Sequence, residues 1–241
     1  MTQLDPLSSE EIAARLSGSP EARAALIRDG AEAGLAEAQA IYGQMLLDAQ
    51  KPAEAFGWFW KAAQQGHPMG LNMLGRCYDL GWGTRIDKVR AAECFRVAAE
   101  GGLDWGMYNY GSALALGAGL TQDKAAALGW FEKAAAMGHA KSINFVGSFH
   151  EEGAIVPRDM VAAADCYALA AEGGDFRGMF NHARMRAEAG DVDGALLWIE
   201  RCGAEAKPVF RAKALAWLAQ VPDERLRTLG TAALRKEGTS C

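Results

Sequence analysis

The apolar positions of this chain recur with a fixed spacing of 36 residues. Between Met69 and Gly102, apolar residues at positions i, i+3 and i+7 form the stripe of one helix face: Leu71, Leu74 and Tyr78. A Gly-x-Gly turn and a second, alanine-rich apolar run follow. The frame returns one period later and again two periods later, so the pattern predicts an array of helical hairpins.

Small and acidic residues of the frame predict how each hairpin closes. Gly75 lies on the side of the apolar stripe, where a missing side chain lets the partner helix approach closely. Gly81 and Gly83 supply the positive φ angles that end the first helix. Carboxylates that can cap the second helices are Asp87, Asp123 and Asp159. Large aromatic residues that we expect to anchor each second helix into the neighbouring hairpin are Phe59, Phe95, Phe131 and Tyr167.

Five such units are predicted, and the link between the helices is shorter in the first and the fifth. Their bounds are 35–66, 67–102, 103–138, 139–174 and 175–206. Capping helices are expected on both sides, in residues 1–34 and 207–241. Within the caps, helices are expected to begin after Ser8 and at Pro20, Pro208 and Pro222.

The composition is that of a folded protein without the clustered basic residues that bind nucleic acid. Half of the 241 residues are hydrophobic and 23% are charged, with a net charge of −5. The basic residues are scattered, which argues against nucleic-acid binding, and no apolar run is long enough for membrane insertion. The first residues lack the basic and apolar regions of a secretory signal, so we expect a cytoplasmic location.

The cysteines point to buried thiols. There are five, no CxxC pair occurs, and most sit at apolar helix positions. Free cysteines of this kind behave as small hydrophobic residues, so neither disulfides nor a metal site is expected. Cys241, as the last residue, is the exception.

With these motifs in place, the chain resembles the Sel-one-like repeat family, a longer-linked relative of tetratricopeptide repeats. The resemblance covers roughly residues 35–206 and rests on the Leu-Gly-x-x-Tyr run, the Gly-x-Gly link, the aspartate before the second helix and the Ala-Ala-x-x-Gly ending. It implies an all-α, right-handed superhelical solenoid whose concave face binds other proteins.

A tetratricopeptide-like arrangement would place the polar positions of the leading helices on that concave face. Aromatic and arginine side chains there often carry binding energy. The predicted partner-binding residues are Gln44, Asn72, Arg76, Asp79, Trp105, Tyr108, Ser112, Asn144, Ser148, Glu151, Arg177, Phe180 and Arg184. The competing interpretation is that these are ordinary solvated positions of amphipathic helices.

No residue pattern indicates catalysis. His150 replaces the tyrosine of the frame, so we expect it to pack between helices with a hydrogen bond rather than to hold a metal. His67 and His139 follow glycines and are expected in loops. No metalloprotease, nucleophile-elbow or phosphate-loop motif occurs, so no catalytic residue, cofactor or metal is predicted.

The favoured function is a non-catalytic scaffold that binds a protein or peptide in its groove. One alternative is an enzyme acting on β-lactams or cell wall, as in cysteine-rich members resembling this family. The paired cysteines and export signal of those members are lacking here. A further alternative is self-assembly into a homo-oligomer through tryptophan-rich helix faces.

Overall fold

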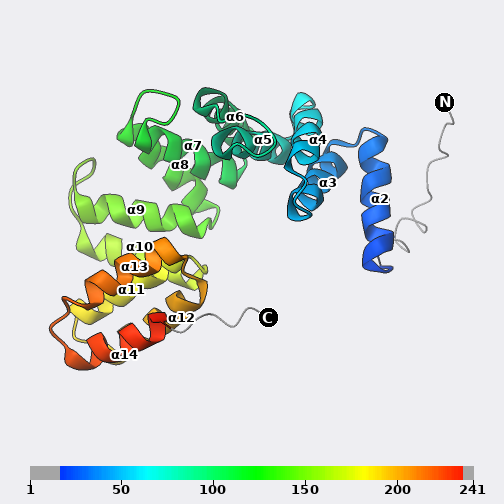
Figure 1. The fold of residues 1–241 in the computed structure, drawn as a ribbon. Helices are drawn as coiled ribbons and strands as arrows, with labels where there is room; N and C mark the ends of the chain where they lie inside the picture. Colours follow the sequence, from blue (N-terminus) through cyan, green and yellow to red (C-terminus); the bar gives the residue numbers. More distant parts are fainter. Residues whose placement is uncertain (1–16, 236–241) are drawn as a thin grey trace. The chain divides into compact units, whose positions relative to one another are not determined.

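A computed structural model describes residues 17–235, which form thirteen helices and no strand (Figure 1). The all-α prediction is confirmed for this part of the chain. The predicted start after Ser8 and the terminal Cys241 lie outside it. The helices are α2 (Pro20–Glu32), α3 (Ala36–Asp48), α4 (Pro52–Gln64), α5 (Pro68–Leu80), α6 (Lys88–Glu100), α7 (Asp104–Leu116), α8 (Lys124–Ala136), α9 (Ala140–Glu152), α10 (Met160–Glu172), α11 (Phe176–Glu188), α12 (Val192–Glu205), α13 (Pro208–Leu218) and α14 (Glu224–Arg235).

The chain divides into two compact units, Met1–Asp123 and Lys124–Cys241. We call α3, α5, α7, α9 and α11 the first helices and α4, α6, α8, α10 and α12 the second helices. Hairpins form where α3 packs on α4 and α5 on α6 in one unit, and α9 on α10 and α11 on α12 in the other. First helices also contact one another, α3 with α5, α5 with α7, and α9 with α11, so their side chains meet.

Capping side chains start several of these helices. Pro20 occupies the first turn of α2, and the main-chain N–H of Ala22 donates to Ser19 Oγ. Asp87 and Asp159 cap α6 and α10 as predicted. The last helix begins at Glu224 rather than at Pro222, because the Asp223 carboxylate caps it by accepting from the N–H of Leu226 at 2.7 Å.

In α3, α5 and α9 a glycine makes room for an aromatic ring. A Cβ atom on Gly75 would lie 2.6 Å from the Phe95 ring, and one on Gly43 would lie 2.7 Å from the Phe59 ring. Three of the aromatic residues thus pack on the first helix of their own hairpin: Phe59, Phe95 and Tyr167. The predicted anchoring into a neighbouring hairpin holds for Phe131, whose ring stacks on Phe145 of α9 with centroids 4.6 Å apart.

The Gly-x-Gly links do more than turn the chain. Gly81 ends α5 with φ 76°, as predicted, and Gly83 follows with φ 69°. A Cβ atom on Gly83 would overlap the carbonyl group of Pro52 at the start of α4, and one on Gly119 would overlap that of Lys88 at the start of α6. The second glycine therefore lets each link pack on the preceding second helix, which holds successive hairpins together.

Candidate functional site

The predicted partner-binding residues all lie on first helices. Gln44 is on α3; Asn72, Arg76 and Asp79 are on α5; Trp105, Tyr108 and Ser112 are on α7; Asn144, Ser148 and Glu151 are on α9; and Arg177, Phe180 and Arg184 are on α11. The structure brings several of them together within each unit and buries others.

Two buried asparagines tie neighbouring first helices together. Asn72 is 2% exposed, and its Oδ1 accepts from Asn109 Nδ2 of α7 at 2.8 Å. Asn144 repeats the contact in the other unit, where its Oδ1 accepts from Asn181 Nδ2 of α11 at 2.9 Å. A buried amide with its partner in place is a structural element. Asn72 and Asn144 therefore position the first helices rather than offering their amides to a partner.

In the first unit, a cavity of about 230 Å³ lies between α5, α6 and α7. Three predicted residues line it, Arg76, Asp79 and Ser112, together with Lys88, Phe95 and Asn109. The remaining lining is apolar and comes from Leu80, Ala91, Ala92, Ala113, Leu116 and Ala118. Leu80 is 48% and Leu116 is 77% exposed, so apolar surface continues from the cavity to solvent.

The charged groups of the cavity are partly paired. Lys88 Nζ donates to Asp79 Oδ1 at 2.6 Å and to the Asp79 main-chain oxygen at 2.8 Å. The Arg76 guanidinium lies over the Trp82 ring, 4.7 Å from its centroid, and burial lowers the pKa of Arg76. Ser112 Oγ donates to the main-chain oxygen of Tyr108 at 2.8 Å, so its hydroxyl group turns back onto its own helix.

Further along the first helices of this unit lie aromatic and amide groups. The rings of Trp105 and Tyr108 meet edge to face with centroids 6.0 Å apart, and Trp105 is 39% exposed. On α3, Gln44 Nε2 donates to Asp48 Oδ1 at 2.7 Å. Amphipathic rings of this kind are frequent anchors in protein interfaces.

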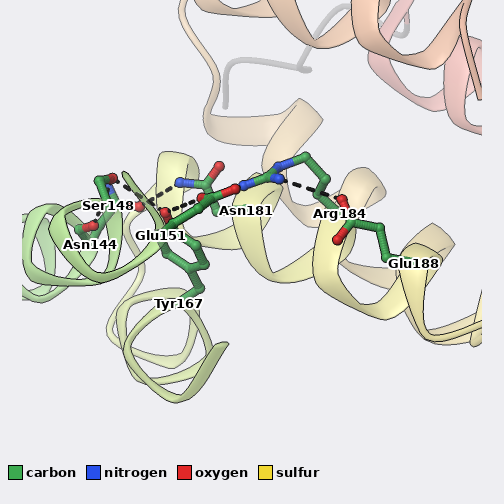
Figure 2. A network of polar contacts seen from close by, with 7 residues as sticks. All are labelled: Asn144, Ser148, Glu151, Tyr167, Asn181, Arg184 and Glu188. Carbon is green, nitrogen blue, oxygen red and sulfur yellow. Dashed lines mark hydrogen bonds and ion pairs between the residues drawn. The ribbon is translucent and has the colours of Figure 1, made fainter. Parts of the chain in front are cut away.

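In the second unit, the corresponding residues form a continuous polar network (Figure 2). Arg184 Nη2 donates to Glu151 Oε2 at 2.7 Å, and the Tyr167 hydroxyl donates to the same oxygen at 2.6 Å. Arg184 Nη1 also approaches Glu188 Oε1 at 3.5 Å. Figure 2 shows the Arg184 side chain reaching from α11 toward α9. Because Glu151 accepts from Arg184 of α11 and from Tyr167 of α10, the network joins two first helices and one second helix.

The network changes the proton affinities of its members. Burial alone would raise the pKa of Glu151, but the hydrogen bonds from Arg184 and Tyr167 lower it below its usual value. Burial and the hydrogen bond to Glu151 raise the pKa of Tyr167. At neutral pH the network therefore holds an ionised carboxylate, a charged guanidinium and a protonated phenol.

Two other predicted residues of the second unit lie elsewhere. Phe180 is buried, and its ring meets the rings of Phe210 and Trp217 of α13, so it belongs to the core and presents no ring to a partner. Arg177 stacks over Phe176, 4.6 Å from the ring centroid. The first helix of the last hairpin is covered by α13, which the sequence pattern treated only as a cap.

Residues that were not predicted to bind a partner also belong to these contacts. Asn109, Lys88 and Leu116 line the cavity, while Asn181 and Tyr167 complete the network. A signal was available for the asparagines. Asn109 and Asn181 lie two periods apart, as do Asn72 and Asn144.

The histidines serve the helix ends and the core. His67 and His139 are not loop residues but N-caps, each accepting from the main-chain N–H three residues later. Nδ1 of His150 is buried and finds no hydrogen-bond partner among residues 17–235, so the expected hydrogen bond is not made at this nitrogen there. Nδ1 of His182 is likewise unpartnered, and burial, with the nearby Arg186, lowers the pKa of this ring.

Reactive thiols and metal ligands do not gather in residues 17–235. Cys77 and Cys202 are buried free thiols, and burial raises the pKa of each to about 12. Cys94 and Cys166 are half-buried and also free. In the same residues no group of three or more His, Cys, Asp or Glu side chains could hold a metal ion. None of the described helices has both the length and the apolar character needed to cross a membrane.

Comparison with known proteins identifies the repeat. The family model of the Sel1 repeat matches residues 36–67, 68–103, 106–139 and 140–175, which together exceed half of the chain. Among curated proteins, the chain is 36% identical over 76 residues to DAP3-binding cell death enhancer 1 of Rattus norvegicus. That match spans 30% of this chain and 14% of the rat protein.

Two solved structures share the fold. A Sel1 repeat protein from Oxalobacter formigenes superposes with a TM-score of 0.69 at 27% identity, covering 84% of this chain and 60% of that one. A protective antigen of uropathogenic Escherichia coli with an SLR fold gives a TM-score of 0.69 at 24% identity, covering 95% of this chain and 56% of that one. The present chain thus spans less than two thirds of each of these relatives.

These matches, together with the helical hairpins, give an all-α solenoid of a kind typical of protein-interaction scaffolds. The resemblance seen in the sequence is confirmed: this chain belongs to the Sel1 repeat family.

Proposed function

We propose that this chain is a non-catalytic scaffold whose first helices bind a protein or peptide partner. The observation that carries the proposal is the cavity between α5, α6 and α7, with apolar and charged walls and exposed leucines at its edge. Trp105 and Tyr108 supply a second anchor on the same unit.

The chemistry of the described residues supports binding rather than turnover. In the cavity Lys88 pairs with Asp79, and in the network Arg184 pairs with Glu151. The thiols of Cys77 and Cys202 have raised pKa values and stay protonated at neutral pH, so they are poor nucleophiles. A relative that matches part of this chain is named for binding a protein, which agrees with a scaffold.

The test is affinity capture from the native lysate with three forms of the full chain. The variant Trp105→Ala/Tyr108→Ala removes the aromatic pair of α7 and should weaken capture of a specific partner at least about tenfold. The matched control is Trp60→Ala, because Trp60 is a 41% exposed tryptophan on a second helix and Trp105 is 39% exposed.

Partner capture by wild type and Trp60→Ala, but not by the folded double variant, would support binding through the first helices. Equal capture by all three forms, or loss in Trp60→Ala alone, would contradict it. Circular dichroism of each variant establishes that it is folded, and light scattering reports any change in self-association.

A further inference from the structure

The cavity of the first unit and the network of the second unit occupy the same place in the repeat. Helices α5, α6 and α7 begin and end two periods of 36 residues before α9, α10 and α11. Both places keep the asparagine pair, Asn72 with Asn109 and Asn144 with Asn181. Side chains can therefore be compared position by position.

At the position of Ser112 the second unit has Arg184. The Arg184 guanidinium lies between the carboxylates of Glu151 and Glu188, and its side chain is only 18% exposed (Figure 2). Glu151 stands where the first unit has Asp79, and Tyr167 stands where it has Phe95. The protein itself thus shows which side chain fits between two first helices and a second helix at this place.

In the first unit that side chain is missing; a carboxylate and an aromatic ring remain as Asp79 and Phe95, and Leu116 stands where the second unit has Glu188. Ser112 is short and its hydroxyl bonds to its own helix, so no hydrogen bond within residues 17–235 joins Ser112 to Asp79. The space is the cavity of about 230 Å³, with a carboxylate at one side and the Phe95 ring, Leu80 and Leu116 as apolar walls. We propose that the cavity receives an arginine side chain of the bound partner, an assignment that rests on the scaffold function proposed above.

The Asp79 carboxylate would bind the guanidinium, and the apolar walls would contact the methylene groups of the arginine stem. Lys88 and the nearby Arg76 compete for this carboxylate, but Lys88 contacts only Oδ1 and the main-chain oxygen. In residues 17–235 no hydrogen bond or ion pair uses Asp79 Oδ2. The Lys88 side chain is 46% exposed, so its ion pair with Asp79 is weak and easily exchanged.

Arginine is favoured over lysine because a planar guanidinium can bind one carboxylate oxygen while its edge lies along an apolar wall. An acidic partner residue would find Arg76 and Lys88 nearby, but it would also bring its charge next to Asp79. The residue at the equivalent position of the second unit is a cation, and the partner group is assigned on that basis.

The experiment is an NMR titration of the full chain with acetyl-arginine N-methylamide, which requires no knowledge of the partner. Acetyl-citrulline N-methylamide has nearly the same shape without the charge, and acetyl-glutamate N-methylamide tests the opposite charge. Wild-type protein should show shifts at the amides of Asp79, Ser112 and Leu116, with the arginine probe binding at least about fivefold more tightly than either control.

Two variants sharpen the result. Ser112→Arg places in the cavity an arginine of the protein itself, as Arg184 does in the second unit. This variant should bind the arginine probe at least about tenfold more weakly than wild type. Lys88→Met introduces the residue found at the equivalent Met160 and removes the competing cation, so binding should tighten about two- to fivefold. The second variant increases binding, so misfolding cannot produce it.

Equal shifts with the citrulline probe, tighter binding of the glutamate probe, or unchanged arginine binding in Ser112→Arg would each overturn the assignment. Because no partner is needed, failure of this titration leaves the scaffold function standing. The scaffold function is tested separately by the capture experiment with Trp105→Ala/Tyr108→Ala.

Discussion

The two equivalent places in this chain, one between α5, α6 and α7 and one between α9, α10 and α11, share a backbone frame but differ in what fills it. Both have a glycine against an aromatic ring and an asparagine pair between first helices. Between α9, α10 and α11 the Arg184 side chain fills the space, and we call this place closed. Between α5, α6 and α7 the equivalent residue is Ser112 and a cavity is present, so we call this place open. The two places thus share the residues that hold the hairpins together and differ in the side chain that lies between the helices.

The largest expected effects concern what the two places share. Gly75→Val would drive a side chain into the Phe95 ring and Gly147→Val one into the Tyr167 ring, each costing about 2–3 kcal/mol in the free energy of unfolding. Gly57→Val is the matched control, because a Cβ there meets no atom within 4 Å, and it should stay within about 0.5 kcal/mol. Urea denaturation measures all three. An unchanged free energy of unfolding in Gly147→Val would contradict the claim that both places share one backbone frame.

The asparagine pairs should also respond alike. Asn72→Ala and Asn144→Ala each leave the amide of the paired asparagine without its acceptor, at a cost of about 1–2 kcal/mol in unfolding free energy. The effects should agree within about 0.5 kcal/mol, since the distances and burial are similar. A cost at one position alone would mean that the pair is structural in only one unit.

The difference between the places should be visible as an unequal response at one position. Arg184→Ala removes the group that joins Glu151 and Glu188, and it should cost about 1–2 kcal/mol in unfolding free energy, since the pair is only partly buried. Ser112→Ala should change the stability by less than about 0.5 kcal/mol, because its hydroxyl bonds only within its own helix. Equal costs would contradict the distinction between a closed and an open place.

The smallest effect is a dependence on pH. The pKa of Glu151 is lower in the folded chain than its ordinary value of 4.5, so its contribution to stability is complete above that value. The contribution is lost as pH falls from 4.5 through the lowered pKa. The stability difference between wild type and Arg184→Ala should therefore shrink by a few tenths of a kcal/mol or more on acidification from pH 7 to about pH 3. A difference that stays constant over this range would show that Arg184 acts through packing alone.

The sequence reveals the fold well because the strongest constraints repeat. Glycine at Gly75 and Gly83 is required by close approach and positive φ, and the same requirements leave glycine again at Gly111, Gly147 and Gly119. The predicted helix caps Asp87 and Asp159 follow from the same local logic. These features depend on short stretches of chain, which a single sequence displays.

The site is harder to predict, because burial at a given repeat position depends on the neighbouring helix. Asn72, Tyr108, Asn144 and Phe180 share one position of the frame, yet Phe180 is covered by Phe210 and Trp217 of α13 and Asn72 by α7. Alignment of the units in the sequence shows that Ser112 and Arg184 occupy equivalent positions. Its consequence, a cavity beside Asp79, required the packing of three helices.

The most direct test of this account is the affinity of the captured partner for wild type and for Ser112→Arg, measured by calorimetry on folded proteins of equal stability. The account predicts that Ser112→Arg, which fills the cavity, lowers the affinity for the partner at least about tenfold. Arg184→Lys, between α9, α10 and α11, should change this affinity little. Unchanged affinity for Ser112→Arg would contradict the claim that the open place between α5, α6 and α7 receives the partner.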